Sequence, residues 1–414
     1  MKTSFENTEV ALGLKSNSEL ERALYLFEMI KWKPLVKIGA VVTKFALKVN
    51  LPVEGLIRST VFDHFCGGIT EDDCLAGIDK MYSKNVHAVL DYSVEGKEEE
   101  VQFDMTMNKI LKTLEYARRN PAIPHIVFKP TGFGRFGIYE KLSSGEGLTP
   151  KEQTEWNKVK NRYNRVCRKA YEYNVPILID AEESWMQDAA DELVESMMSK
   201  YNKEKVIVFN TLQLYRHDRF EYLKELHQRA TKGGFKIGLK LVRGAYLEKE
   251  RKRATRLGYQ DPICTDKNKT DTLYKDVLIY MVKNLREMSL FAGTHNEEST
   301  YLLMKLMKEH KIAANDKRIW FGQLFGMSDH ISYNLADIGY NVAKYLPYGP
   351  VKEVMPYLLR RAEENTSVAG QTSRELFLIK KEMKRRKSVL IVGSDVTPIN
   401  ESEYLLKNEP SGNF

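Results

Sequence analysis

The most constraining feature of this sequence is a regular alternation, beginning near residue 87, between short apolar runs and longer segments of helical periodicity. Continuous short apolar runs are typical of strands covered on both faces, as in a parallel sheet. Segments such as DAADELVESMMSKYN instead repeat their apolar residues every three or four positions, as an amphipathic helix does. Eight strands, each followed by a helical stretch, predict a (β/α)8 barrel over roughly residues 87–365. A doubly wound open sheet is the rival fold, but it usually has fewer such units. The expected strands are residues 87–94, 125–131, 176–182, 206–213, 236–244, 289–296, 319–326 and 341–349.

The segments that flank this α/β pattern are predicted to be helical. Residues 1–85 show helical spacing, and Thr70 followed by acidic residues is a typical helix start. We therefore divide the chain into an N-terminal helical segment (1–85), a catalytic barrel (86–366) and a basic helical tail (367–414). A basic amphipathic helix can lie on an anionic membrane surface. Packing of the tail on its own domain is the alternative interpretation.

Composition excludes several classes of protein. The formal charge of +8, from 64 basic and 56 acidic residues, is modest for 414 residues and does not indicate a nucleic-acid partner. No apolar run approaches the ~18 residues that span a bilayer, and the N-terminus lacks the apolar core of a signal peptide. The four cysteines are too widely spaced for a disulfide framework or a zinc site, so a reducing compartment is expected.

Polar residues gather where the predicted strands end. Active sites of (β/α)8 barrels lie at the carboxyl ends of their strands, so convergence of these residues predicts a site. Lys129 and Asp180, from neighbouring strands, are the expected ion pair, either within a site or as a structural bridge across the barrel mouth. The polar residues at strand ends are Asp91, Glu95, Lys129, Asp180, Glu182, Gln213, Lys240, Arg243, His295, Asn296 and Tyr345.

A helix that carries two adjacent arginines follows the last predicted strand. Tyr357 lies one turn before Arg360 and Arg361, and Glu364 lies one turn after them, so all four can share a face. The planar guanidinium fork suits carboxylates and phosphates. A solvated charge stripe is the alternative, since exposed ion pairs are common and weak.

Two weaker motifs were also weighed. Gly132-x-Gly134-x-x-Gly137 matches a dinucleotide fingerprint formally, but a polar loop rather than an apolar helix is expected before a helix near residue 150. We interpret it as a glycine-rich loop that could cover the barrel mouth as a mobile lid. Asp180, Glu182, Glu183 and His295 could bind a divalent metal, but no histidine or cysteine pattern supports one, and none is predicted.

Three further groups suit a large cofactor. The small residues Gly244 and Ala245 would let a flat ring approach the backbone beside Lys240 and Arg243. His295 and Asn296 can hydrogen-bond a cofactor ring or phosphate, although a satisfied buried histidine is the alternative. Side chains at a following helix start suit a diphosphate: Thr265, Lys267, Thr270 and Tyr274.

Taken together, the segments LIDAEE, KLVRGAYLEKER, AGTHNEES, FGQLFGMSD and KYLPYGPVKEVMPYLLRRAEEN resemble the proline dehydrogenase family over roughly residues 60–370. The resemblance implies noncovalently bound FAD at the strand ends. It also implies oxidation of L-proline to Δ1-pyrroline-5-carboxylate, the first step of proline catabolism, by hydride transfer from C5 to flavin N5. The chain looks like a monofunctional member, with Δ1-pyrroline-5-carboxylate dehydrogenase as a separate enzyme. A membrane quinone as electron acceptor and a cytoplasmic location with peripheral inner-membrane contact are the family expectations, and the oligomeric state stays open.

The resemblance also implies a role for individual residues. Arg360 and Arg361 match the pair that grips the substrate carboxylate with Lys129, and Asp180 matches the aspartate that holds this lysine. Tyr345 matches the tyrosine beside the proline ring, Tyr357 and Leu324 match the other walls, and Glu364 matches the glutamate that orients the arginines. Many bacterial relatives have Arg-Leu-Val-Lys where this chain has Lys240-Leu-Val-Arg243, so the resemblance implies that Lys240 is the basic residue nearest flavin N5. The positions that match FAD-binding residues are Gln213, Lys240, Arg243, Gly244, Ala245, Tyr246, Thr265, Lys267, Thr270, His295 and Asn296.

Three alternatives to a proline dehydrogenase remain. A 4-hydroxyproline dehydrogenase of the same family is one, although such relatives tend to have a smaller residue at the position of Tyr345. A metal-dependent aldolase or hydrolase barrel and a non-catalytic binding barrel are the others.

Overall fold

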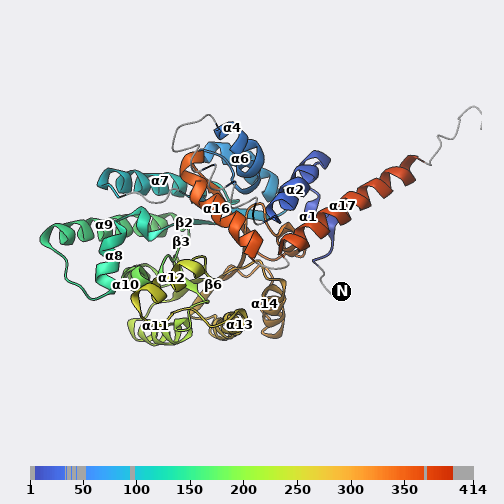
Figure 1. Ribbon diagram of the computed structural model, residues 1–414. Helices are drawn as coiled ribbons and strands as arrows, with labels where there is room; N and C mark the ends of the chain where they lie inside the picture. The colour runs from blue at the N-terminus through green and yellow to red at the C-terminus, as the bar shows by residue number, and fades with distance from the viewer. Residues whose placement is uncertain are drawn as a thin grey trace, which may run out of the picture.

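A computed structural model describes residues 5–32, 53–93, 98–367 and 371–394, with isolated positions at 34, 39 and 43. Its eight parallel strands form one closed barrel in sequential order, which confirms the predicted (β/α)8 fold (Figure 1). The barrel closes where the first and last strands pair, from Val86 opposite Val342 to Tyr92 opposite Tyr348. The strands are β1 (Val86–Tyr92), β2 (His125–Phe128), β3 (Ile177–Ile179), β4 (Val208–Gln213), β5 (Ile237–Val242), β6 (Met288–Gly293), β7 (Ile319–Leu324) and β8 (Val342–Tyr348).

Helices surround the barrel, and their ends follow from local sequence. Thr149 caps the longest of the outer helices: its hydroxyl accepts from the amide of Glu152, and the Glu152 carboxylate accepts from the amide of Thr149. The helices between strands are α7 (Glu100–Arg119), α8 (Phe136–Ser143), α9 (Pro150–Tyr173), α10 (Ser184–Tyr201), α11 (Arg219–Gly233), α12 (Leu247–Leu257), α13 (Lys267–Lys283), α14 (Glu297–Glu309) and α15 (Asp329–Asp337), and α16 (Val351–Ser367) follows β8.

The described part of the segment before the barrel is mainly helical. Thr70 caps α6 with a reciprocal hydrogen-bond pair to Asp73, as its sequence predicts. Earlier in the chain, the π-helical turn η1 (Arg58–Phe62) joins two short helices. The α-helices of the segment are α1 (Thr8–Leu12), α2 (Asn17–Ile30), α4 (Glu54–Ile57), α5 (Asp63–Phe65) and α6 (Glu71–Tyr82).

The tail helix α17 (Gln371–Ser394) packs on the N-terminal helices and then runs outward from the barrel (Figure 1). Leu376 and Ile379 are buried in a cluster with residues of α1 and α2. The basic side chains between 380 and 386 contact the N-terminal segment: Lys380 pairs with Glu28 at 2.7 Å, and Arg386 donates to two backbone carbonyls there. These contacts favour packing of the tail on its own molecule.

The barrel interior holds two different layers of side chains. Its apolar layer consists of Val89, Val127, Leu178, Phe209, Phe291, Trp320, Ala343 and Tyr345. Glycine makes room for two of these rings, because a Cβ on Gly322 would lie 2.1 Å from Phe291 and one on Gly238 would lie 2.8 Å from Phe209. Side chains alternate along a strand, so the inward position two residues after Val89, Val127 and Leu178 falls on Asp91, Lys129 and Asp180.

The glycine-rich segment after β2 differs from its prediction. Phe133 is fully buried and stacks on Phe128 with ring centroids 4.3 Å apart, and the Tyr139 hydroxyl donates to the Pro130 carbonyl. A helix, α8, begins at Phe136 where a polar loop was expected. That expectation was wrong because the aromatic residues of this segment anchor it to the outside of β2.

Among the described residues, no helix combines the length and apolarity that crossing a lipid bilayer requires.

Candidate active site

Two buried ion pairs occupy the carboxyl end of the barrel. The Lys129 ammonium lies 3.3 Å from a carboxylate oxygen of Asp91 on β1, and the Lys240 ammonium donates to Asp180. The predicted Lys129–Asp180 pair is therefore wrong. Lys240, two strands away on β5, reaches into the barrel and takes the carboxylate of Asp180, which leaves Lys129 beside β1.

Tyr345 forms an aromatic wall above these pairs. The Lys240 ammonium lies 4.6 Å from the centroid of the Tyr345 ring, and Phe291 packs edge-on against the same ring at 5.8 Å. Burial, and then the nearby Asp180 and Asp91, raise the pKa of Tyr345 well above its usual value, so the phenol stays neutral. Its hydroxyl is buried and has no hydrogen-bond partner among the described residues.

Helix α16 follows β8 and buries one of its two adjacent arginines. Gly349, with φ +143°, turns the chain directly after β8, and the helix begins at Val351. Arg361 is only 7% exposed, and its guanidinium lies 5.1 Å from the Tyr357 ring centroid. Burial of this kind argues against a solvated charge stripe.

Leu324 connects the arginine helix with the barrel interior. It packs against the buried cluster that contains Tyr357 and also against the one that contains Tyr345. Leu324 thus lies next to both clusters that contain the other predicted substrate walls, Tyr357 and Tyr345. Glu364 belongs to α16, but its side chain lies outside the described residues, and so does all of Glu95.

Arg243, just after β5, is held on several sides. It donates to Asp271 at 2.8 Å, to the Thr294 hydroxyl at 2.9 Å and to the Ser299 hydroxyl at 3.1 Å. The Tyr274 ring faces its guanidinium with the centroid 4.6 Å away. The structure therefore joins the ends of β5 and β6 to the start of α13.

The predicted diphosphate residues at the start of α13 lie at different depths. Lys267 is exposed and pairs with Asp271, the partner of Arg243. Thr265 is exposed, whereas Thr270 is buried and donates back to the carbonyl of the capping residue Asp266. Of these residues, Lys267 is therefore the one that is linked to Arg243, through Asp271, and that also reaches the surface.

Gly244, Ala245 and Tyr246 form the exposed rim beyond Arg243. Gly244 has φ +132°, and a Cβ there would lie within 2.4 Å of the Tyr215 ring. Only glycine fits this backbone, which leaves main-chain atoms open at the barrel mouth.

His295 and Asn296 occupy the end of β6. Asn296 caps α14 by accepting from the amide of Ser299 at 2.8 Å. Burial, followed by the positive charges of Lys344 and Arg361, lowers the pKa of His295 to about 3, so its ring is neutral. The Leu324 amide points to its Nε2 at 3.4 Å, which makes Nδ1 the donor to the Ser328 hydroxyl at 2.9 Å.

Gln213 ends β4 and is almost fully buried. Its side-chain nitrogen donates to the Ala181 carbonyl at 3.5 Å, while its side-chain oxygen has no hydrogen-bond partner among the described residues. A buried acceptor without a partner is costly, so this oxygen is a candidate contact for a bound molecule.

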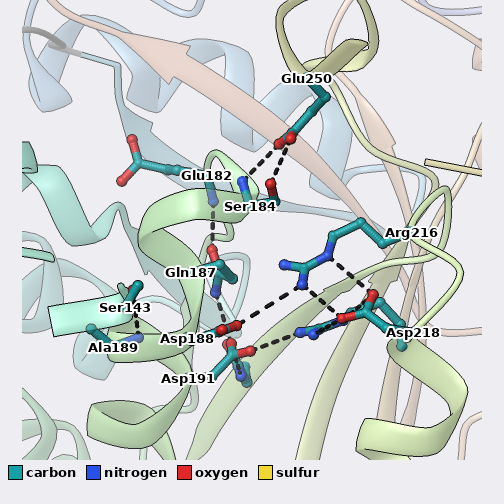
Figure 2. Close-up of polar contacts among 12 residues, drawn as sticks. Ser143, Glu182, Ser184, Gln187, Asp188, Ala189, Asp191, Arg216, Asp218 and Glu250 are labelled. Carbon is teal, nitrogen blue, oxygen red and sulfur yellow. Dashed lines mark hydrogen bonds and ion pairs between the residues drawn. The ribbon is translucent and has the colours of Figure 1, made fainter. Parts of the chain in front are cut away.

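A polar network fixes the loop after β3 (Figure 2). Both carboxylate oxygens of Glu250 accept from Ser184, at 2.7 Å from its amide and 2.6 Å from its hydroxyl. The amide of Glu182 donates to Gln187, while its carboxylate points away from that network in Figure 2 and accepts from Thr131 at 2.9 and 2.7 Å. Burial raises the pKa of Glu182 to about 7 despite these hydrogen bonds.

Several residues that shape the site were not predicted from the sequence. Lys344 on β8 is 1% exposed, pairs with Asp329 at 2.7 Å and donates to the Met327 carbonyl at 2.7 Å. Ser328 and Thr294 hold His295 and Arg243. The available signal was Lys344 itself, because a lysine within an apolar strand requires a partner.

Among the residues that the structure describes, no group of three or more histidine, cysteine, aspartate or glutamate side chains is arranged to hold a metal ion.

A closed parallel barrel with ion pairs, an aromatic wall and a buried arginine at the carboxyl ends of its strands defines the class of (β/α)8 barrel enzymes. The family model described as proline dehydrogenase matches residues 74–374. The chain is 35% identical to the carbapenem antibiotics biosynthesis protein CarD of Pectobacterium carotovorum subsp. carotovorum, over 80% of this chain and 86% of CarD. It is 33% identical to proline dehydrogenase 1, mitochondrial, of Dictyostelium discoideum, over 82% of this chain and 67% of that protein. The chain therefore belongs to the proline dehydrogenase family and is an enzyme of that family.

A solved structure shows the same fold. Proline utilization A from Bdellovibrio bacteriovorus superposes with a TM-score of 0.67 at 22% identity, over 88% of this chain. The chain spans about a third (36%) of that much longer protein.

Proposed function

We propose that this enzyme oxidises L-proline to Δ1-pyrroline-5-carboxylate with noncovalently bound FAD. The observation that carries the proposal is the buried Arg361 on α16, which stacks on Tyr357 at a barrel mouth that also holds Lys129. A guanidinium that is buried to this extent is better suited to binding a small carboxylate than to being solvated by water.

In this proposal the substrate carboxylate binds Arg360, Arg361 and Lys129. The Glu364 carboxylate orients the arginines, and Asp91 holds the Lys129 ammonium at 3.3 Å. The proline ring packs between Tyr345, Tyr357 and Leu324, and Leu324 supports this arrangement because it packs against the clusters of both tyrosines. Fixing the carboxylate and the ring together orients C5, which is the main contribution that a protein makes to hydride transfer.

The residues at the mouth fit a flavin. The buried Gln213 oxygen has no partner in the described structure, and Gly244 exposes its backbone at the rim. We assign FAD binding to Gln213, Lys240, Arg243, Gly244, Ala245, Tyr246, Thr265, Lys267, Thr270, His295 and Asn296. When bound, FAD supplies the acceptor for the hydride that leaves C5 of proline.

Lys240 takes a role different from that of a free cation in this proposal. Asp180 accepts from its ammonium, and the Tyr345 ring lies against the same group. Asp180 therefore acts by fixing the position of Lys240 instead of that of Lys129. Lysine offers a point charge and not a fork, so a fixed position matters more for it than for arginine.

The visible spectrum of the purified full-length protein tests the proposal. We expect flavin absorption bands that bleach when L-proline is added anaerobically. A colourless protein that a divalent metal activates would replace the proposal with a metal-dependent barrel enzyme. A folded protein whose melting temperature responds to neither FAD nor proline analogues would indicate a binding module instead.

The closest alternative substrate is 4-hydroxyproline. Tyr345 is buried and its ring is fixed by Phe291 and Lys240, so little room remains for an added hydroxyl. We expect a higher kcat/KM for L-proline than for 4-hydroxy-L-proline, and the reverse ratio would assign the second activity.

For the electron acceptor we propose a membrane quinone, reached by peripheral contact with the inner membrane from the cytoplasm. The basic side chains of α17 support this only weakly, since Lys380 and Lys381 already pair with Glu28 and Glu6. Steady-state reduction of a soluble ubiquinone analogue by proline, with and without anionic vesicles, tests the acceptor and the membrane contact separately. We propose that the downstream dehydrogenase is a separate protein. No nucleic-acid or metal partner is proposed.

A further inference from the structure

The β7–α15 loop, residues 325–328, is held by other parts of the chain. His64 of the N-terminal segment lies 2.9 Å from the Gly326 carbonyl through its Nε2. Burial lowers the pKa of His64 to about 4, so the ring is neutral and this nitrogen carries the donated proton. Lys344 of β8 donates to the Met327 carbonyl at 2.7 Å.

The tail helix makes another buried contact with this loop. The carboxylate of Glu375, on α17, accepts from the Ser328 amide at 2.6 Å, and the Glu375 side chain is almost fully buried. Ser328 has φ +53°, a left-handed conformation that costs a residue other than glycine about 1 kcal/mol or more. Such a conformation persists when its surroundings fix it, and the Glu375 carboxylate is one group that does so.

Ser328 passes this restraint on to the proposed site. Its hydroxyl accepts from His295 Nδ1 at 2.9 Å, while the amide of Leu324, just before the loop, lies 3.4 Å from His295 Nε2. Ser328 and the end of β7 thus contact the two nitrogens of a neutral imidazole, which fixes the ring orientation and its tautomer. His295 is a proposed flavin residue, and Leu324 is a proposed substrate wall.

A second anchor prevents the loop from moving as a unit. Asp329 pairs with Lys344 at 2.7 Å and with Lys15 at 3.2 Å, which ties the start of α15 to β8 and to the N-terminal segment. Burial would raise the pKa of Asp329, but the two ammonium groups outweigh it and hold the pKa below the usual value. Because Asp329 is fixed, we expect loss of the Glu375 contact to change the backbone conformation at Ser328 and not to move the whole loop.

We infer that Glu375 is a positioning residue: by holding the Ser328 backbone, it sets the orientation of His295 and Leu324, so the tail helix α17 is part of what shapes the site. The inference rests on the proposed function for its catalytic consequence. Its structural step, from Glu375 through Ser328 to His295, does not depend on the identity of the substrate.

A purely structural role would make Glu375 only a tether for α17, and a matched variant separates the two roles. Glu382 lies on the same helix, is fully buried and accepts from Arg385 and Arg386 at 2.8 Å each. Glu382→Gln should weaken the docking of α17 without touching the β7–α15 loop. It therefore controls for any general effect of loosening the tail.

The direct readout is the tautomer of His295, measured by nitrogen-15 NMR on histidine-labelled full-length protein and assigned with His295→Asn. We expect the wild type and Glu382→Gln to show the Nδ1-protonated form, and Glu375→Ala to show a changed nitrogen shift for His295. Glu375→Gln should restore most of the wild-type signal, because its amide oxygen can still accept from the Ser328 amide. An unchanged His295 signal in Glu375→Ala, or an equal change in Glu382→Gln, would overturn the inference.

The catalytic readout uses the FAD-loaded enzyme and L-proline. Glu375→Ala should lower kcat/KM roughly tenfold, the size expected when a buried donor loses a charged acceptor. In a Ser328→Ala background the further loss should be smaller, because the route through the hydroxyl is already broken. Independent, fully multiplicative losses would contradict transmission through Ser328. A shifted His295 signal without any flavin reduction by proline would refute the proposed function. It would still support the structural step from Glu375 through Ser328 to His295.

Discussion

Both ends of the barrel are made by the same strands, but they bury different groups. At the amino-terminal end, His125 lies among the rings of Phe209, Phe291 and Trp320, with centroids 5.9, 5.4 and 4.9 Å away. At the carboxyl end, the inward positions hold ion pairs such as Lys240 with Asp180.

The difference shows two ways in which a polar group can be buried. Burial lowers the pKa of His125 to about 3, so this histidine enters the apolar layer as a neutral ring. Lys240 and Lys129 instead lie beside carboxylates. The amino-terminal end therefore buries its polar group in neutral form, and the carboxyl end, where we propose that the ligand binds, keeps its charges in pairs.

The largest effect is expected from breaking a charge pair at the mouth. Asp180→Ala leaves the Lys240 ammonium buried without its carboxylate, which should lower the free energy of unfolding by ~3–5 kcal/mol. Urea denaturation measures the loss. Asp271→Ala, which removes one partner of the half-exposed Arg243, should cost only about 1 kcal/mol. Equal losses in the two variants would show that the mouth charges do not depend on buried pairing.

The next effect concerns Glu182 at the mouth. Burial raises its folded-state pKa to about 7 from an ordinary value near 4.5, so its contribution to stability is present below pH 4.5 and is lost as the pH rises through 7. At 1.36 kcal/mol per pKa unit the loss is about 3 kcal/mol. The free energy of unfolding of Glu182→Gln, relative to the wild type, should rise by this amount between pH 4.5 and pH 8. A constant difference across that range would contradict burial as the cause.

A smaller effect is expected when a cation of the proposed carboxylate site is removed. Arg361→Met and Arg360→Met should raise KM for L-proline roughly 10- to 100-fold with less change in kcat, because the carboxylate contact is already made in the ground state. Arg229→Met, which breaks an exposed pair with Glu195 on the outer helices, is the matched control and should leave KM unchanged. Unchanged KM in both site variants would sink the substrate assignment.

The smallest effect is expected at the amino-terminal end. The depressed pKa of His125 means that its stabilising contribution is complete above pH 6.5 and is lost as the pH falls toward 3. By pH 5 the loss is about 2 kcal/mol. Between pH 7 and pH 5 the free energy of unfolding of the wild type should therefore fall by about 2 kcal/mol more than that of His125→Phe. Denaturation at both pH values measures the difference. Its KM for proline should not change, and a changed KM would break the separation of the two ends.

Much of the fold follows from local patterns. All eight expected strands are present, because an apolar run bounded by helical segments has few other ways to bury both of its faces. The end of β4 at Gln213 was predicted correctly, but the other ends were placed too late: β2 stops at Phe128 and β3 stops at Ile179, each just before a charged residue. The parallel ladder ends there because the following segments diverge into separate helices.

The site was predictable as a set of residues more than as a set of contacts. Period-two alternation puts Asp91, Lys129 and Asp180 at inward positions. The burial of Arg361 on α16 agrees with the expectation that the arginine pair binds a carboxylate. Which carboxylate each lysine takes was not predictable, because strand tilt and the reach of a lysine across the barrel decide it. The roles of Ser328 and Glu375 were also hidden, since they depend on the tail helix meeting a loop that lies 47 residues earlier in the chain.

The sequence by itself determined the barrel, the end of it that carries polar groups and the helix that bears the arginine pair. Those properties depend on periodicity, which is local. Only the tertiary structure decided that Lys240 pairs with Asp180, that Lys129 lies beside Asp91 and that the tail helix holds Ser328. Each of those contacts joins strands or helices whose relative height and distance are set by barrel closure, and closure is a property of all eight strands together.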